Sequence, residues 1–217
     1  MKKRKQSKID VQFTVQVAIA AFLLGVLITS LAGGNMPSGS IGTVSASEII
    51  PTGVPSVYGK ELKISYDAVS PDNQQLADQT IATLSAIDKS ETLEGEDLQR
   101  YIDILYNLED GISCEYCCGA RSVIFDTGEP ACGCAHSYAM RGLTKYLIKY
   151  HGDEYTNEEI LEEVGKWKVL FFPGIMEAKA AILEENGVEF NYINLASNKY
   201  RGIEQGQSSG GDMVGGC

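Results

Sequence analysis

Apolar side chains recur at helical spacing in several segments of the chain. The clearest set precedes Gly111 and consists of Leu98, Tyr101, Ile102, Leu105 and Leu108. This spacing predicts a helix that ends at the glycine, and similar spacing predicts helices over residues 70–87, 135–151 and 174–186. Thr156 and Glu159 match a capping box, which predicts the start of a further helix. The pattern therefore indicates a mainly α-helical domain.

Three shorter segments favour β structure. Apolar and polar residues alternate in residues 61–69, and residues 188–195 have the length and composition of a second short strand. Within the loop of residues 112–133, the run 122–125 leads into Asp126-Thr127-Gly128, which is typical of a small hairpin. We therefore expect minor β structure beside the helices.

The longest apolar stretch lies near the N-terminus, where residues 11–35 contain no charged side chain. As a helix, residues 11–32 would span about 33 Å at about 1.5 Å per residue, close to the thickness of a bilayer. The basic residues before this stretch place the N-terminus in the cytoplasm. We therefore predict a single-pass anchor in the cell membrane, with the lipid bilayer as its partner and the ectodomain outside the cytoplasm. A cleaved signal peptide is the alternative, and it also exports the domain.

The composition divides the chain into five parts. Residues 1–10 are basic and residues 11–32 form the expected anchor. Residues 33–60 are rich in Gly and Pro and are predicted to be a flexible stalk. Residues 61–199 are the helical ectodomain, and residues 200–217 contain six glycines, which predicts a disordered tail ending in Cys217.

The charge distribution excludes one class of partner. The chain has a formal net charge of −11, and residues 1–10 hold five basic and one acidic side chain, a net +4, which leaves −15 for the rest. A surface of this sign repels nucleic acid. We therefore expect no nucleic-acid partner.

The cysteines gather in one short region. Five of the six cysteines and one of the two histidines fall within 23 residues: Cys114, Cys117, Cys118, Cys132, Cys134 and His136. Two spaced groups of sulfurs joined by a short loop suit a tetrahedral site, and thiolates are soft ligands that favour Zn or Cu. We predict that these six residues are the ligand pool of one metal ion. Met140 shares a face with His136, but packing in the core explains a methionine there better than ligation does.

Two other chemistries fit the same residues. In an oxidising compartment the six cysteines can form three structural disulfides, which would make the chain a stapled surface protein without chemistry. Alternatively, Cys114 with Cys117, or Cys132 with Cys134, can act in thiol–disulfide exchange, because Cys134 precedes a predicted helix whose N-terminus favours a thiolate. His136 then activates a thiol instead of binding an ion. The partner would be a protein that exchanges metal or thiols with this chain.

The remaining signals do not indicate an enzyme of another kind. No phosphate loop, paired carboxylates or hydroxyl nucleophile with a base stands out, and no Cys-x-x-Cys-His occurs for haem attachment. Cys217 is far from the cluster in sequence, and its glycine-rich tail predicts a mobile extra ligand or thiol.

Two groups of exported proteins resemble part of this chain. Cys132-Gly-Cys134-Ala-His136 before a predicted helix, followed by Thr156-Asn-Glu-Glu-Ile160 at the start of another, resembles the PCYCGC-motif family of cysteine-rich surface proteins. It also resembles the membrane-tethered Cys-x-x-Cys subunit of cytochrome c maturation, a three-helix bundle. The similarity covers about residues 114–173; Ala131 departs from the first motif, and Cys132-x-Cys134 departs from the second. The resemblance implies an exported helical domain with exposed thiols.

Overall fold

The computed structural model describes residues 46–114, 119–205 and 213–216. These ranges belong to one compact unit. The predicted basic segment 1–10 and anchor 11–32 therefore lie outside the described residues. Within the described ranges, no helix has the length and apolar character needed to cross a bilayer.

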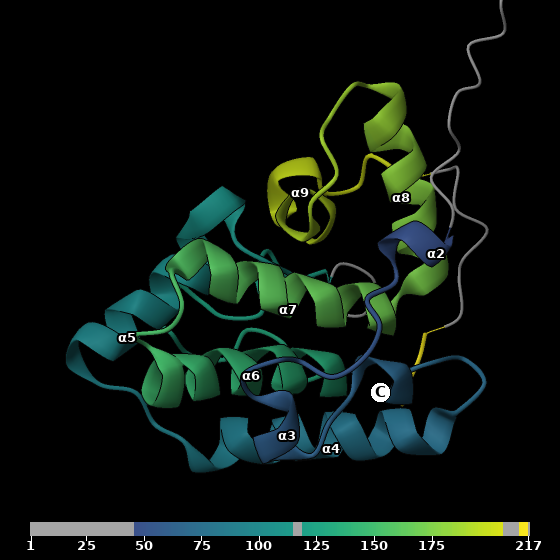
Figure 1. Cartoon of the computed structure of the whole chain (residues 1–217). Coiled ribbons are helices and arrows are strands. Elements are labelled where there is room, and N and C mark those ends of the chain that lie inside the picture. The colour runs from purple at the N-terminus through teal and green to yellow at the C-terminus, as the bar shows by residue number, and fades with distance from the viewer. Residues whose placement is uncertain (1–45, 115–118, 206–212, 217) are drawn as a thin grey trace, which may run out of the picture. The chain divides into compact units, whose positions relative to one another are not determined.

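The described part of the chain is mainly helical, as the hydrophobic pattern predicted (Figure 1). Its α-helices are α2 (Ala46–Ile49), α3 (Gly59–Leu62), α4 (Gln74–Ser90), α5 (Gly95–Ile102), α6 (Ala135–His151), α7 (Asn157–Phe171), α8 (Pro173–Glu185) and α9 (Tyr192–Ala196). Shorter turns are the 3-10 helices η1 (Tyr66–Ala68), η3 (Leu108–Asp110) and η4 (Asn198–Tyr200) and the π-helical turn η2 (Asp103–Asn107). Among the described residues, β structure is limited to two isolated bridges, Ile112 with Ser197 and Ile124 with Pro130.

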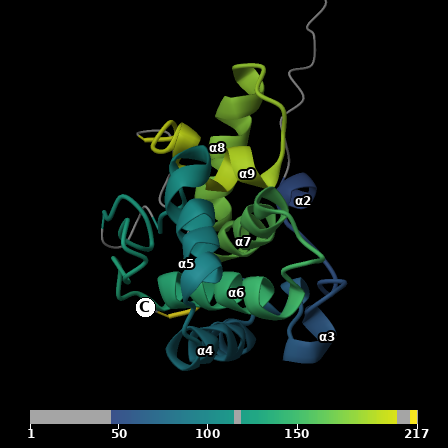
Figure 2. The same ribbon diagram turned by 90° about the vertical axis from the view of Figure 1, so that its left-hand side faces the viewer.

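Helices α4, α6 and α7 are stacked in that order, and α8 and α9 lie beyond α7 (Figures 1 and 2). Gly142 allows α6 to approach α4 closely, because a Cβ atom at this position would lie 1.9 Å from the Leu84 carbonyl oxygen. Gly165 has the same role between α7 and α9, where a Cβ atom would meet the Tyr192 carbonyl oxygen at 2.8 Å. These two glycines set the spacing of the layers that hold the cysteine region.

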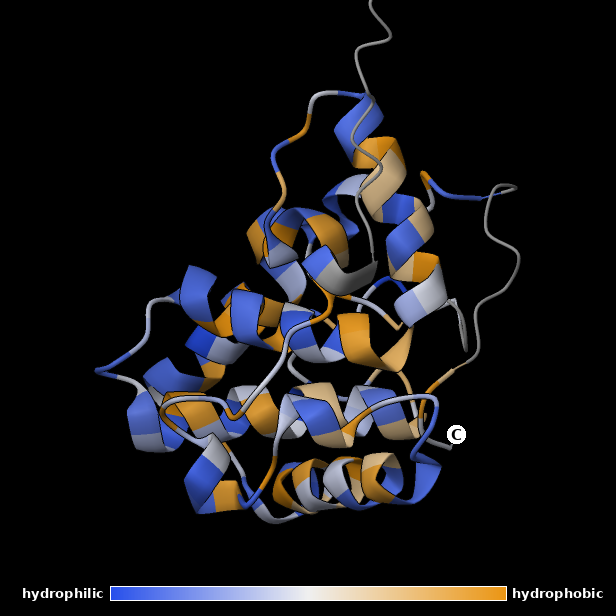
Figure 3. Ribbon diagram, turned by 45° about the vertical axis from the view of Figure 1, so that its right-hand side comes forward, coloured by the Kyte–Doolittle hydropathy of each residue, from blue (hydrophilic) through white to orange (hydrophobic). Residues whose placement is uncertain are grey.

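The hydrophobic core lies between these layers. Figure 3 shows hydrophobic and hydrophilic residues alternating along α4, as expected of a helix with one buried face. On α7 the apolar face is wide, and Trp167 and Phe171 are wholly buried together with Phe172, which ends the helix. These three aromatic residues belong to the core, and the predicted core position of Met140 is confirmed.

The long helices begin and end close to the predicted positions. Helix α6 has the predicted bounds, and α7 carries the predicted capping box, in which Thr156 Oγ1 accepts from the Glu159 N–H at 3.2 Å. Helix α4 starts later than predicted, because Asn73 caps it by accepting from the Leu76 N–H. The helix predicted before Gly111 is α5, whose winding changes in η2 and η3 before the glycine takes a φ of 79°.

Both predicted strands are wrong. Residues 61–69 form the end of α3 and then η1, because Lys63 takes a left-handed conformation that ends α3 and Ser65 caps η1. Ile64 and Tyr66 are both buried, as the alternation of apolar and polar residues predicted. Their side chains reach the core from the turn after α3 and from η1, and not from a strand. In the second segment, Asn191 caps α9 by accepting from the Asn194 N–H at 2.7 Å. The predicted hairpin is a tight turn closed by the Ile124–Pro130 bridge.

The predicted stalk is wrong for residues 46–60, which pack on the domain. Ile49 and Tyr58 are buried, and Pro51 and Pro55 are buried between them. The Tyr58 hydroxyl accepts from Trp167 Nε1 at 2.8 Å, which fixes this segment to α7. Prolines and glycines here shape a fitted covering segment, whereas residues 33–45 lie outside the described residues.

The prediction of a disordered tail is wrong for residues 213–216. Val214 is wholly buried, and its N–H donates to the Phe171 carbonyl oxygen at 3.0 Å. The N–H groups of Gly215 and Gly216 donate to side-chain oxygens of Gln74 and Asp78 on α4. Burial of the Val214 side chain and backbone hydrogen bonds of Val214, Gly215 and Gly216 therefore hold this segment on the domain.

Candidate functional site

Residues 112–134, here called the cysteine loop, are held in place by residues from the end of the fold. The Asn198 side chain accepts from Ser113 Oγ at 2.7 Å and donates to the carbonyl oxygens of Asp110 and Arg121 at 2.9 and 2.8 Å. The loop also pairs with Ser197 through the Ile112 bridge. The segment that carries Cys114 is therefore fixed by contacts more than 80 residues away in the chain.

The other end of the cysteine loop is held by a buried arginine on α6. Arg141 is wholly buried, and its Nη1 donates to the carbonyl oxygens of Cys132 and Val123 at 2.8 and 3.2 Å. The rest of its guanidinium pairs with Asp88 on α4, with Nε and Nη2 each 2.9 Å from Oδ2. Lys145 completes the cluster at 2.8 Å from the other carboxylate oxygen of Asp88. One ion cluster thus joins α4, α6 and the cysteine loop.

These contacts bring two cysteines together at the start of α6. The Sγ atoms of Cys114 and Cys134 lie 3.2 Å apart, although the residues are 20 positions apart in sequence. Cys134 is the N-cap of α6, and its sulfur lies 3.4 Å from the Ser137 backbone nitrogen and 3.2 Å from the Ser137 hydroxyl oxygen. Cys114 is buried, whereas Cys134 is partly exposed.

This environment favours the thiolate form of Cys134. The hydrogen bond with Cys114 lowers the pKa of the Cys134 thiol most, and contacts with His136 and Ser137 add to it, so that together they outweigh the effect of burial. The position at a helix N-terminus acts in the same direction, because the dipole stabilises a negative charge there. A sulfur of this kind can bind a soft metal ion or act as a nucleophile.

His136 is wholly buried and contacts Cys134. Its ring stacks against Phe171 and Phe172 with centroids 4.8 and 5.0 Å away, and its Nε2 is 2.9 Å from the Val214 carbonyl oxygen. A carbonyl can only accept, so Nε2 carries a proton. This hydrogen bond fixes the orientation of the ring, as hydrogen bonds to backbone carbonyls do in many metal-binding histidines.

The predicted ligands are only partly gathered in the described structure. It brings Cys114, Cys134 and His136 to one end of α6 and fixes Cys132 through its backbone carbonyl. Cys117, Cys118 and Cys217 lie outside the described residues. Within the described ranges, no group of three His, Cys, Asp or Glu side chains converges as a metal-ligand set.

Several residues that shape the site were not predicted from the sequence. Ser137 follows the N-cap by three positions, where a capping partner is expected, so its contact with Cys134 had a local signal. Arg141 and Asp88 had no local signal, because they read only as charged residues in helices with apolar neighbours. Their role depends on the approach of α4 to α6.

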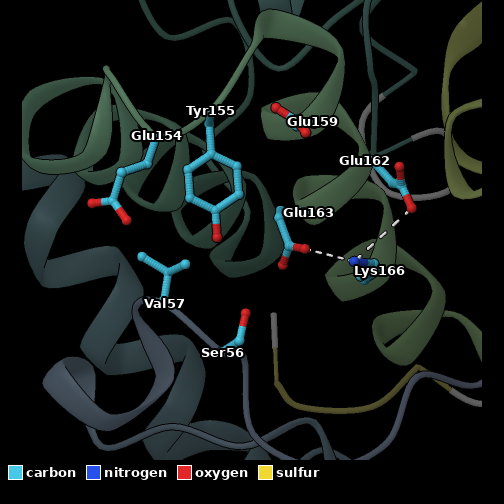
Figure 4. Close-up of a pocket in the computed structure, with 8 residues that line it drawn as sticks. All are labelled: Ser56, Val57, Glu154, Tyr155, Glu159, Glu162, Glu163 and Lys166. Atoms are coloured by element: carbon cyan, nitrogen blue, oxygen red, sulfur yellow. Dashed lines mark hydrogen bonds and ion pairs between the residues drawn. The ribbon is translucent and has the colours of Figure 1, made fainter.

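A hollow away from the cysteines lies beside α7 (Figure 4). It has a volume of about 320 Å³ and is lined by Ser56, Val57, Glu154, Tyr155, Glu159, Glu162, Glu163 and Lys166. Glu163 accepts from the hydroxyls of Tyr58 and Tyr66 at 2.8 and 2.6 Å and pairs with Lys166 at 2.6 Å. Burial is the main reason that the pKa of Tyr58 is raised, which keeps its hydroxyl protonated as a donor. These contacts attach residues 51–66 to α7.

The far end of α6 carries the second histidine. His151 is 8% exposed and lies between two carboxylates, with Nδ1 2.7 Å from Glu154 and Nε2 3.1 Å from Glu61. Burial lowers the pKa of His151, but hydrogen bonds with Glu154 and Glu61 and their charges outweigh burial and raise it. The carboxylates thus add to the helix dipole, which also favours a cation in the last turn of α6.

Comparison of the chain with protein-family models, curated proteins and solved structures finds no match. The resemblance to the two groups of exported cysteine proteins therefore stays a prediction. Function has to be inferred from the residues and their geometry.

Proposed function

We propose that this chain is a membrane-anchored, extracytoplasmic protein that binds one soft metal ion, Zn or Cu, through thiolates at the start of α6. The observation that carries the proposal is the meeting of Cys114 and Cys134, whose sulfurs come from distant parts of the sequence and lie 3.2 Å apart. Two adjacent sulfurs, one of them favoured as a thiolate, would supply half of the ligands of a tetrahedral site.

The sulfur separation is compatible with a shared ion after a small adjustment. With metal–sulfur distances of about 2.3 Å, two sulfurs of a tetrahedral site lie about 3.8 Å apart. The pair at 3.2 Å would therefore open by roughly half an ångström. The other ligands would come from Cys117, Cys118 and Cys132, or from His136 through Nδ1.

The exposure of the two cysteines indicates which sulfur a partner protein would reach first. Cys134 is partly exposed, whereas Cys114 is buried. A partner that delivers or removes the ion would therefore reach Cys134 first. Such transfer suits metal handling outside the cytoplasm better than catalysis.

The proposed location rests on the N-terminal sequence. Basic residues 1–10 before the apolar residues 11–32 favour a single-pass anchor with the domain outside the cytoplasm. Protease added to intact cells should then remove a C-terminal epitope. Recovery of the mature-size ectodomain from the medium would contradict the anchor.

The metal proposal is tested by variants of the full-length chain purified in detergent without oxygen. Wild type should contain about one ion per chain, and Cys114→Ser and Cys134→Ser should each lose most of it, because each removes a thiolate ligand. Thr144→Ser is the matched control, since this buried hydroxyl lies on α6 and bonds only within the helix, to the Met140 carbonyl. Full metal content in both cysteine variants would contradict the proposal.

A further inference from the structure

The sulfurs of Cys114 and Cys134 are also placed to react with each other. Their separation of 3.2 Å exceeds a disulfide bond of about 2.05 Å, so the atoms are in contact but not bonded to one another. We propose that Cys114 and Cys134 form a redox-active dithiol pair that exchanges electrons with a disulfide substrate. This inference goes beyond metal binding and applies to the metal-free chain.

The structure pairs cysteines that the sequence did not pair. Sequence spacing pointed to Cys114 with Cys117, or to Cys132 with Cys134, as the working pair. Among the described residues, Cys134 Sγ contacts Cys114 Sγ at 3.2 Å. A bond between them would link the start of α6 to the segment that follows η3.

Both sides of the pair are held by neighbouring backbone. Next to Cys114, the Ile112 N–H donates to the Leu105 carbonyl oxygen at 3.0 Å, and the Ile112 carbonyl oxygen accepts from the Val123 N–H at 2.9 Å. Cys134 is fixed by its place as the cap of a 17-residue helix. Because both segments are held, the Cys114 and Cys134 thiols stay close together. This proximity favours formation of the intramolecular disulfide over a lasting disulfide between Cys134 and a substrate.

The exposure of each cysteine indicates which sulfur attacks the substrate and which resolves the mixed disulfide. The Cys114 residue is 2% exposed and cannot meet a substrate first. Cys134 is partly exposed and lies at the helix N-terminus, so it is the attacking sulfur. Cys114 is then the resolving sulfur.

The reaction proceeds by two exchanges. The Cys134 thiolate attacks one substrate sulfur, a mixed disulfide forms, and the substrate S–S bond breaks to release the other sulfur as a thiolate. The Cys114 sulfur then attacks Cys134 Sγ, the mixed disulfide breaks, and the second substrate sulfur leaves. The two protons of the protein thiols end on the two substrate sulfurs. The protein dithiol is oxidised by two electrons, and the substrate disulfide is reduced to two thiols.

Peptide mapping gives a direct test. Trypsin cleaves after Arg100, Arg121 and Arg141, which places Cys114 on peptide 101–121 and Cys134 on peptide 122–141. In a variant with Cys117→Ser, Cys118→Ser and Cys132→Ser, each peptide keeps a single cysteine. The full-length, metal-free variant is incubated with glutathione and glutathione disulfide in graded ratios and then quenched with acid and alkylated. A second arm uses a disulfide-bonded peptide in place of glutathione disulfide, which separates small from peptide substrates.

The expected product is one cross-linked pair of peptides, 101–121 with 122–141, that increases with the proportion of disulfide. Adding Cys114→Ala should leave glutathione bound to Cys134, because the resolving thiol is missing. Wild type provides a check that needs no variant, since fragmentation of its cross-linked peptides should locate the same bond. Bonds confined to other cysteines in wild type, or a persistent glutathione adduct on Cys134 when Cys114 is present, would overturn the inference. Metal content is measured separately, so the metal proposal can fail while the dithiol pair stands, or the reverse.

Discussion

Replacing Arg141 by methionine should both destabilise the domain and loosen the cysteine loop. The guanidinium is wholly buried, pairs with Asp88 on α4 and donates to the carbonyl oxygens of Val123 and Cys132. Methionine has a similar length but neither the charge nor the donors. The variant would therefore leave a buried carboxylate with a single cation, Lys145, and two loop carbonyls without this donor.

The size of the effect follows from these contacts. Removing one partner of a buried ion pair costs about 3–5 kcal/mol. The remaining ion pair with Lys145 reduces this cost, and the Val123 carbonyl keeps the Ala131 N–H as a donor. Loss of the hydrogen bond to the Cys132 carbonyl adds about 0.5–1.5 kcal/mol. We therefore expect a loss of about 3–5 kcal/mol in the free energy of unfolding, which corresponds to a fall in Tm of about 6–20 °C for a domain of this size.

The assay is urea unfolding of the full-length chain in detergent, followed by far-ultraviolet circular dichroism. Lys149→Met is the matched control, because Lys149 lies on the same helix but its ion pair with Glu91 is exposed, and such pairs contribute about 0–1 kcal/mol. Alkylation of Cys132 should also become faster in Arg141→Met, since its carbonyl loses a donor. If Arg141→Met costs no more than Lys149→Met, the buried cluster does not hold the loop as described.

Three further predictions test other parts of the fold. Gly142→Ala should lower Tm by more than the few degrees expected of ordinary overpacking, because its Cβ would overlap backbone on α4. Gly133→Ala is the control, since a Cβ there meets nothing within 4 Å. Equal Tm values for the two variants would contradict the close approach of α6 to α4. His151→Gln should lower Tm at about pH 6 but not at about pH 9. The raised pKa of His151 stabilises the fold below the unfolded pKa of about 6.5, and this stabilisation disappears as the pH rises through the folded pKa. A Tm difference between variant and wild type that does not change with pH would argue against the carboxylate contacts. Deletion of residues 213–217 should cost about 1.5–3 kcal/mol, as expected for losing a fully buried Val214, and an unchanged urea midpoint would show that the segment does not pack.

Local signals in the sequence predicted the long helices well. The bounds of α6 and the capping box of α7 depend on residues within a turn of each helix end, so one segment contains the whole signal. Residues 61–69 and 188–195 were predicted as strands, because their apolar spacing masked the caps at Ser65 and Asn191 that begin η1 and α9. Both elements also pack on α7, and no local pattern records these contacts. The same holds for residues 46–60 and 213–216, whose glycines and prolines indicated disorder.

The candidate site was predicted as a set of residue types but not as a geometry. Clustering in the sequence selected the cysteines and His136 as candidates. The contact between Cys114 and Cys134 arises because the start of α6 meets the segment after η3, which requires the whole fold. The roles of Arg141 and Asp88 could not be predicted either, because a buried ion pair between two helices has no signature in one sequence.

The central claim is that sulfur atoms of this chain bind a metal ion. It is tested most directly by X-ray absorption at the metal edge of the full-length protein, purified in detergent without oxygen. Thiolate ligation predicts at least two sulfur atoms at about 2.3 Å from the ion, and this signal should weaken in Cys134→Ser. A first shell that contains only nitrogen and oxygen at about 2.0–2.2 Å would contradict it.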